Sequence, residues 1–430
     1  MAVLTASKDI NTASRWDLSA DPEVSAEERA RQIEIIAERL VTVAVKGGGR
    51  KPTACPGNVE IVLMEDPLFV KALVYDGFKN VVEWRGVPLT DADITAIRLA
   101  MGRTYRITPS VALMAEMLHY AAKQREFHPV RDYLVKLRWD GRHRLATMLK
   151  TYCAAPDTRL NAELGRRFMI SAVARVMNPG CKVDTTLILA GPQGYFKSTF
   201  FRVLAGEGWF CDTPIDMRNK DAYLALRGAW LYEMAELSSM RPRDAETVKA
   251  FLAAQEDHFR PPYGREMVDA KRQCVFVGTT NETGFLNDPT GARRFWPVAV
   301  RAPIRLDEVR AAREQLWAEA VEAWRRGERW WLEEDGDEEL RDIHQDYESE
   351  DPWETLISEW IDSQPPGSEV TIGGVLTVAL KIDIGQQNRS HEMRVAGLLV
   401  RLGFKRRRIT VRGKRGWVYD RPSQRQVSLL

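Results

Sequence analysis

The spacing of the hydrophobic residues predicts three regions of different structure along the chain. In the first region, apolar residues recur at intervals of three or four over Ala26–Val45, the period of an amphipathic helix. The segment Lys46–Arg50 then predicts a loop, because its three consecutive glycines do not favour a helix. Further helical spacing fills residues 58–128 around a turn or hairpin near Tyr75–Val87. We therefore expect an α-rich N-terminal domain over residues 1–126, in which no residue suggests a catalytic role.

In the second region, short apolar runs alternate with helical segments from Trp139 to Arg301. The runs have the length and the β-branched or aromatic content of buried strands, and they are Thr185–Ala190, Ala229–Met234 and Cys274–Thr280. Such alternation predicts an α/β unit with a largely parallel sheet. A tryptophan-rich helix is expected to follow at Leu306–Trp324.

The third region begins with a strongly acidic stretch, residues 333–352, which we interpret as a linker or an exposed helix. Two helices are predicted after it, over Trp353–Val378 and Ser390–Leu402, and a β-hairpin over Phe404–Tyr419. Helices followed by a basic hairpin indicate a small winged-helix-like domain over residues 353–430.

Net charge is only +2, but its distribution is uneven. Residues 401–425 contain ten lysines and arginines against one aspartate, which indicates a nucleic-acid surface or, alternatively, a solvated basic face. The five cysteines form no C-x-x-C pair and fit a reducing compartment. The start of the sequence lacks the apolar core of a signal peptide, and no 18-residue apolar stretch occurs. We expect a cytoplasmic protein that does not span a membrane.

The most informative motif is GPQGYFKST, which runs from Gly191 to Thr199 between an apolar run and a helical segment. In a phosphate-binding loop of this order, backbone N–H groups and a helix N-terminus face an anion. Lys197 would reach the β- and γ-phosphates of ATP, and the Ser198 hydroxyl would hold Mg²⁺. Gly191, Gly194 and Thr199 complete the expected nucleotide site.

One position departs from the pattern G-x-x-x-x-G-K-[ST], because Phe196 stands where the pattern has glycine. Glycine tolerates positive φ and allows the backbone to approach a phosphate closely. Two glycines remain earlier in the loop, and the other parts of an ATPase site follow in the sequence. We therefore favour a working site.

Carboxylates follow the next apolar run, in the sequence Trp230–Leu237. A P-loop ATPase needs an acidic strand beside its loop, with one acid to orient Mg²⁺ and another to polarise the attacking water. We favour Glu233 for the metal and Glu236 for the catalytic base. Their E-x-x-E spacing does not decide which glutamate binds the metal and which acts as the base. One of them can be an ordinary charge at a strand end.

Two further polar groups follow in the order that an ATPase requires. Asn281 ends the third apolar run and has the chemistry to contact a γ-phosphate, as a polar residue on the central strand does in AAA+ ATPases. Arg293 and Arg294 lie about ten residues later, beside a turn. Either can supply an arginine finger to a neighbouring subunit, and either can be a surface arginine.

These four elements occur in stretches that resemble the virulence-associated protein E family, the ATPases of phages, phage satellites and genomic islands that are related to superfamily 3 helicases. The stretches that carry the resemblance are Phe127–Leu134, Leu137–Gly141, Gly191–Gly206, Trp230–Leu237, Lys249–Leu252, Phe259–Arg265, Gly278–Asp288 and Gly291–Val298. We therefore expect the α/β class, with a P-loop AAA+-like ATPase core over residues 127–332. The resemblance implies ATP and Mg²⁺ as cofactors, DNA as partner and a homo-hexameric ring.

The resemblance also implies a hairpin within residues 256–275 that points into the pore of the ring. Its basic residues would contact the DNA strand, and they are Arg260, Arg265, Lys271 and Arg272. An ordinary surface loop is the alternative. Further DNA contacts are expected from the C-terminal hairpin, at Arg406, Arg407, Arg408, Lys414 and Arg415.

The sequence thus predicts an ATP-dependent DNA motor, a replicative helicase or replication initiator of a phage or mobile element. One alternative is a non-catalytic DNA-binding or regulatory protein with a degenerate loop. Another is an ATPase that remodels DNA without unwinding it.

Overall fold

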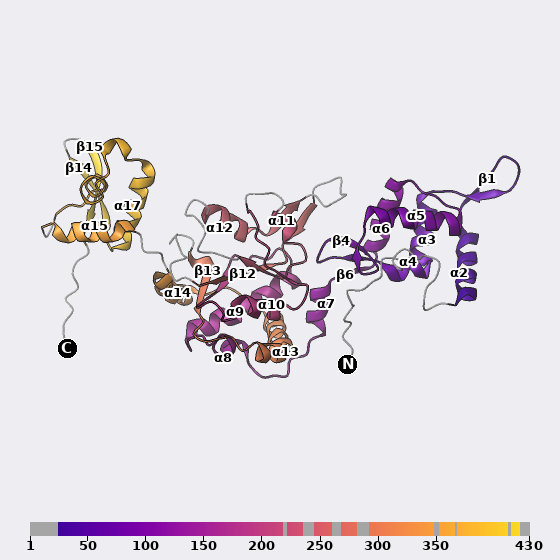
Figure 1. Cartoon of the computed structure of the whole chain (residues 1–430), viewed down its shortest axis with the longest axis horizontal. Helices are drawn as coiled ribbons and strands as arrows, with labels where there is room; N and C mark the ends of the chain where they lie inside the picture. Colours follow the sequence, from indigo (N-terminus) through magenta and orange to yellow (C-terminus); the bar gives the residue numbers. More distant parts are fainter. Residues whose placement is uncertain are drawn as a thin grey trace. The chain divides into compact units, whose positions relative to one another are not determined.

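The computed structural model describes residues 25–217, 222–234, 245–259, 268–281, 292–347, 352–365, 368–411 and 414–421. The chain forms two compact units, residues 1–347 and residues 348–430, coloured along the sequence in Figure 1. Within the described ranges, no helix combines the length and the apolar character needed to cross a membrane.

The N-terminal part of the first unit has its own apolar core, formed by helices around a small sheet. The helices are α2 (Ala26–Arg39), α3 (Pro56–Glu65), α4 (Pro67–Ala72), α5 (Asp91–Tyr105) and α6 (Val111–Lys123). The sheet has the order β5-β4-β3-β6, with β3 (Leu73–Asp76), β4 (Val81–Trp84), β5 (Val87–Pro88) and β6 (Glu126–Phe127).

The helix expected over Ala26–Val45 is shorter than predicted, because α2 ends at Arg39. Residues after it form strand β1 (Thr42–Ala44), which pairs antiparallel with β2 (Arg50–Pro52). Valine and threonine favour an extended backbone, and the glycines between the two strands allow the chain to reverse. Local β-propensity therefore overrides the helical spacing here.

A five-stranded parallel sheet forms the centre of the first unit, in the order β13-β7-β12-β9-β8. Its strands are β7 (Thr186–Ala190), β8 (Phe210–Cys211), β9 (Leu231–Met234), β12 (Val275–Thr280) and β13 (Phe295–Ala299). All three predicted apolar runs are strands of this sheet. The acidic strand β9 is separated from the loop strand β7 by β12, and Glu233 on β9 still reaches Ser198 after the loop at 2.7 Å.

Helices cover both faces of this sheet (Figure 1). Along β7, Leu187 and Leu189 belong to one core and Ile188 and Ala190 to another, because successive side chains of a strand point to opposite faces. The first face packs against α9 (Arg159–Met177), α10 (Lys197–Ala205) and α13 (Leu306–Arg325). The second face packs against α11 (Ala222–Ala225) and α12 (Ala245–Ala253).

Of the two interpretations of the acidic stretch at residues 333–352, a linker or an exposed helix, the structure forms a helix over most of it. Residues Glu334–Tyr347 form helix α14, on which Leu340 is buried in the core that contains α9. The buried His344 ring contacts the carbonyl oxygen of Phe295 at 2.7 Å. These few buried side chains are enough to hold an otherwise acidic helix against the sheet. In the sequence they do not stand out, because acidic residues dominate this stretch.

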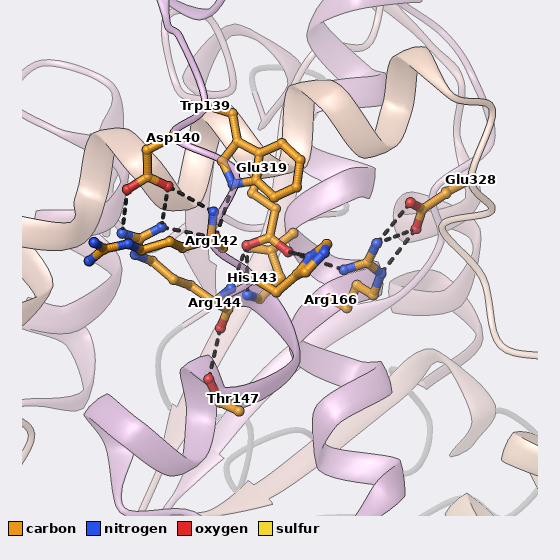
Figure 2. A network of polar contacts seen from close by, with 10 residues as sticks. Trp139, Asp140, Arg142, His143, Arg144, Thr147, Arg166, Glu319 and Glu328 are labelled. Carbon is orange, nitrogen blue, oxygen red and sulfur yellow. Dashed lines mark hydrogen bonds and ion pairs between the residues drawn. The ribbon is translucent and has the colours of Figure 1, made fainter.

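The segment between α7 (Pro129–Lys136) and α8 (Met148–Cys153) is held by a polar network around the buried carboxylate of Glu319 on α13 (Figure 2). This carboxylate accepts hydrogen bonds from the backbone N–H groups of Arg144, at 2.6 Å, and Leu145, at 3.1 Å. Arg166 on α9 approaches it to 3.3 Å. One carboxylate therefore joins the segment, α9 and α13.

Two outer pairs complete the network in Figure 2. Asp140 accepts both arms of the Arg144 guanidinium, at 2.7 and 2.8 Å, and this pairing holds the Asp140 pKa well below its usual range. Glu328 accepts two bonds from one nitrogen of Arg166, at 2.6 and 2.8 Å. These two pairs hold the guanidinium groups of Arg144 and Arg166 in fixed positions within the network.

The second unit has a separate apolar core. Its elements are α15 (Pro352–Ser363), α16 (Ile372–Gly374), a π-helical turn (Val375–Ala379), a 3₁₀ turn (Ile384–Gln386), α17 (Arg389–Arg401), β14 (Lys405–Val411) and β15 (Lys414–Asp420). The single helix expected over Trp353–Val378 is wrong, because α15 ends at Ser363, just before Pro365. The hairpin prediction is confirmed, since β14 and β15 pair antiparallel. The winged-helix assignment stays a prediction.

Replacing Glu319 by alanine is expected to lower the free energy of unfolding by about 1–3 kcal/mol, because the N–H groups of Arg144 and Leu145 would lose their acceptor and Arg166 would keep Glu328 as its carboxylate partner. Chemical denaturation of the two variants Glu319→Ala and Glu322→Ala tests this. Glu322 lies on the same helix and pairs with Arg326 at the surface, so its loss should cost less than about 1 kcal/mol. Equal losses in both variants would contradict the bracing role of Glu319.

Candidate functional site

The predicted phosphate loop follows the carboxyl end of β7, and α10 begins at Lys197. Gly191 is required by close approach, since an added Cβ would lie 2.5 Å from the carbonyl oxygen of Val300. Its N–H donates to the Thr280 carbonyl oxygen at 3.1 Å. Gly194 has a φ of +84° with open space around it. The first glycine thus bonds the loop to β12 and allows it to lie against Val300, and the second permits its turn.

Phe196 has a φ of 61° and a ψ of 28°, which is the left-handed region that glycine would normally occupy. Its side chain is 50% exposed, and its carbonyl oxygen accepts the first helical hydrogen bond, from Phe200 N–H at 2.9 Å. The left-handed conformation costs an L-residue about 1–2 kcal/mol. With phenylalanine in place of the glycine of the motif, the backbone at this position still adopts the left-handed conformation that the motif requires. This conformation is strained for phenylalanine.

The Lys197 ammonium group is buried and has three acceptors. It donates to the carbonyl oxygens of Gly191, at 2.7 Å, and Pro192, at 2.9 Å, and to the side-chain oxygen of Asn281, at 2.8 Å. Burial lowers the Lys197 pKa, whereas the nearby Glu233 opposes this shift. The structure therefore brings together the loop lysine and the asparagine that follows β12.

Beside this lysine, two hydroxyl groups donate to one carboxylate oxygen. Ser198 and Thr279 donate to Oε1 of the buried Glu233 at 2.7 and 2.6 Å, and the two hydroxyl oxygens lie 3.4 Å apart. Sequence reasoning did not assign Thr279 to the site. Its only signal was the polar run Thr279–Asn281 at the end of an apolar strand.

The group around Glu233 fits a magnesium ion by its chemistry. A serine hydroxyl and a carboxylate are hard oxygen donors, and Mg²⁺ usually takes one or two protein ligands together with phosphate and water. Ser198 and Glu233 would hold the ion, which would neutralise phosphate charge. No group of three histidine, cysteine, aspartate or glutamate side chains that could hold a metal occurs in the described part of the chain. Thr199 lies in the first turn of α10, half-buried.

Some predicted residues cannot be located. Glu236, Arg260 and Arg265 lie outside the described residues. For Lys414 and Arg415 the structure describes the backbone alone. Their predicted roles stay predictions.

The two arginines proposed as an arginine finger for a neighbouring subunit lie at the other edge of the sheet. Arg293 and Arg294 end a 3₁₀ turn (Ala292–Arg294) directly before β13. Because β13 runs parallel to β7, this turn lies at the amino edge, whereas the loop follows the carboxyl edge. Five strand residues separate the edges by about 15 Å. Neither arginine therefore belongs to the Lys197 group of its own chain.

The two arginines also differ in their surroundings. Arg294 is half-buried, and its Nε lies 3.6 Å from a carboxylate oxygen of Asp184. Arg293 is exposed. A charge that must act on another molecule has to be accessible, so Arg293 has the better position for such a role.

The expected hairpin within residues 256–275 exists, formed by β10 (Glu256–Phe259) and β11 (Val268–Lys271). Lys271 is exposed, but the DNA-contact prediction for Arg272 is wrong. The Arg272 side chain is buried, bonds to Asp257 at 2.5 and 3.0 Å and lies over the Phe251 ring. This arginine fixes the base of the hairpin and is not accessible to a nucleic acid.

The basic residues of the C-terminal hairpin fall into two groups. Arg406 and Arg408 are exposed and lie over the ring of Trp417, at 4.0 and 5.7 Å from its centroid. Arg407 instead pairs with Asp420 at 2.8 Å and with Glu369 at 3.3 Å, and this pairing lowers the Asp420 pKa. Arg407 is therefore a weaker candidate for a phosphate contact than its two neighbours.

The strain at Phe196 leads to a prediction for a matched pair of variants. Phe196→Gly should keep or raise the free energy of unfolding, by up to about 1 kcal/mol, because glycine tolerates positive φ. Phe196→Ile should lower it by about 1 kcal/mol or more, because a β-branched residue tolerates this region least. Urea denaturation compares the two. The opposite order would show that residue 196 does not adopt the left-handed conformation.

Comparison with known proteins relates the ATPase-like part of the chain to a known family. The family described as virulence-associated protein E-like domain matches residues 134–349, which is 216 of the 430 residues. No curated protein matches the chain.

Two solved structures align with parts of the chain. The apo structure of the C-terminal region of NrS-1 is 11% identical, with a TM-score of 0.46, and the alignment covers 85% of this chain and 99% of that one. A RuvB mutant from Thermotoga maritima is 14% identical, with a TM-score of 0.23, and the alignment covers 61% and 95%. The family match spans the loop, the five-stranded sheet and the helices around it, and the chain belongs to the virulence-associated protein E-like domain family.

Proposed function

We propose that this protein is an ATP-dependent DNA motor, a replicative helicase or replication initiator of a phage or mobile element. The observation that carries the proposal is the convergence of Lys197, Ser198, Glu233, Thr279 and Asn281 at one edge of a parallel sheet. These residues come from three separate segments. They include a buried cation, an acid and three polar neighbours, the groups that phosphoryl transfer from a nucleotide needs.

Each residue has a role in this proposal. The Lys197 ammonium, now held by loop carbonyl oxygens, would bind the β- and γ-phosphates of ATP. Asn281, bonded to that lysine, would contact the γ-phosphate. Ser198 and Glu233 would hold Mg²⁺, and Thr279 would orient the Glu233 carboxylate through its hydrogen bond. Glu236 stays our choice for the base that polarises the attacking water.

We further propose that Arg293 acts on the nucleotide of a neighbouring subunit in a homo-hexamer. Its exposure and its distance from its own loop support action between chains, since a residue at the opposite edge cannot reach the phosphate of its own subunit. A finger used in this way requires a closed ring or another repeating assembly. Arg294 would instead hold the turn through Asp184.

DNA would be contacted by two basic hairpins. Lys271, with Arg260 and Arg265, would contact phosphates from the hairpin formed by β10 and β11, and such contacts are independent of sequence. Arg406 and Arg408 would do so from the proposed winged-helix-like domain, where the half-exposed Trp417 adds a surface for stacking on a base.

Replacing Lys197 by alanine is expected to reduce DNA-stimulated ATP hydrolysis by about 10²–10³-fold, because a charged donor to the phosphates is lost. Steady-state turnover with and without single-stranded DNA measures this effect. Lys182→Ala, at an exposed surface lysine, is the matched control and should hydrolyse ATP like the wild type. If the wild type itself does not hydrolyse ATP, the non-catalytic DNA-binding alternative replaces the motor. Hydrolysis without strand displacement on a forked duplex favours the remodelling ATPase.

Arg293→Ala is expected to lower turnover by about 10³-fold or more while nucleotide binding is retained, because the arginine would act on the transferring phosphoryl group of the neighbour. Mixing Arg293→Ala subunits with Lys197→Ala subunits should restore part of the activity, since some interfaces then combine an intact loop with an intact arginine. Failure of the mixture to recover activity, in an assembly shown by mass measurement to contain both variants, would exclude action between subunits.

A further inference from the structure

The hairpin formed by β1 and β2 has no role in the proposed motor. Its strands pair from Thr42 opposite Pro52 to Ala44 opposite Arg50, and the three glycines that follow Lys46 lie at its tip. Every residue from Val43 to Lys51 is exposed. In Figure 1 the hairpin extends away from the helices of the N-terminal part. An exposed two-stranded hairpin gains little stability from its own contacts, so its presence calls for another explanation.

The tip of this hairpin consists of three glycines and therefore has no side chains. Gly47, Gly48 and Gly49 have φ values of +102°, +87° and +94°, and nothing lies within 4 Å of a Cβ added to any of them. The glycines are therefore needed for conformation and not for packing within the protein. A tip without side chains can approach another molecule closely through its backbone.

The exposed side chains from Val43 to Lys51 are all apolar or basic. Val41, Val43 and Val45 are 41–59% exposed, and Lys46 and Lys51 are exposed beside them. No acidic residue occurs between residues 40 and 59. The hairpin thus combines exposed methyl groups with positive charge and carries no carboxylate of its own.

The root of the hairpin is fixed to the protein by a buried amide. Asn58, at the start of α3, accepts a hydrogen bond from Val41 N–H at 2.7 Å and donates to the carbonyl oxygens of Val41, at 2.8 Å, and Thr53, at 2.9 Å. Between the two strands, Arg50 donates to the hydroxyl and carbonyl oxygens of Thr42 at 2.6 and 2.8 Å. These bonds join the two strands and give the hairpin a defined direction.

We propose that this hairpin is a DNA-binding element that enters the major groove of duplex DNA. The major groove of B-DNA is wide enough for a two-stranded ribbon. Lys46 and Lys51 would then neutralise phosphates, the glycine tip would approach the backbone, and the valine methyl groups would contact base edges, including the methyl group of thymine. Positive charge on a hairpin that has no acidic residue of its own favours DNA over a protein partner. The inference rests on the proposed action on DNA, but it does not depend on ATP hydrolysis.

The test compares binding of the full chain to a short DNA duplex, by fluorescence anisotropy without nucleotide, at several salt concentrations. The variant Lys46→Ala/Lys51→Ala should bind about tenfold more weakly. The slope of log K against log salt should become shallower by about 2, since each phosphate contact contributes about 0.9. The matched control Lys136→Ala/Lys150→Ala removes two exposed lysines elsewhere in the same unit and should keep the wild-type slope. Gly48→Val, which strains the tip, should weaken duplex binding without changing the net charge.

Several outcomes separate this inference from its alternatives. An unchanged slope in the hairpin variant, or the same change in the control, would overturn it. An equal loss on single-stranded and duplex DNA would overturn the placement in the major groove. A change in oligomeric mass without DNA would assign the hairpin to a contact between proteins. ATP hydrolysis without DNA should equal that of the wild type in the hairpin variant, so a failure of the motor proposal remains distinguishable from a failure of this one.

Discussion

Opposite charges buried at one edge of a parallel sheet are the constraint on which the rest of the first unit depends. The Lys197 ammonium and the Glu233 carboxylate are both removed from water, and a buried charge is stable only when hydrogen bonds compensate it. The compensation comes from residues distant in sequence, Asn281 for the lysine and Thr279 for the glutamate. The site therefore exists only when β7, β9 and β12 are aligned in one register.

That register in turn depends on the helices on both faces of the sheet. The alternation of side chains along β7 distributes them between two cores, so neither face can be uncovered without a loss of apolar burial. On one face, Glu319 fixes α9, α13 and the segment before α8 relative to one another. On the other, the buried Arg272 fixes the base of the β10–β11 hairpin between Asp257 and Phe251. Polar groups buried outside the site thus hold the elements that form it.

Phe196 shows how such a framework can accommodate an unfavourable residue. The backbone conformation at this position is set by the connection between β7 and α10, and the side chain is half exposed. The cost of about 1–2 kcal/mol is a local one. It is small beside the contacts that hold the surrounding strands and helix.

The sequence by itself determined the α/β class, the apolar runs that become β7, β9 and β12, and the place of Lys197, Ser198, Glu233 and Asn281 after or within them. These features depend on local composition and periodicity, which a single sequence contains. Only the tertiary structure decided that β12 separates β9 from β7, that Thr279 joins Glu233, that Arg272 is buried and that the two arginines before β13 lie at the far edge. The physical reason is that strand order, burial and the partner of a charge depend on residues far away in the chain, which no local pattern specifies.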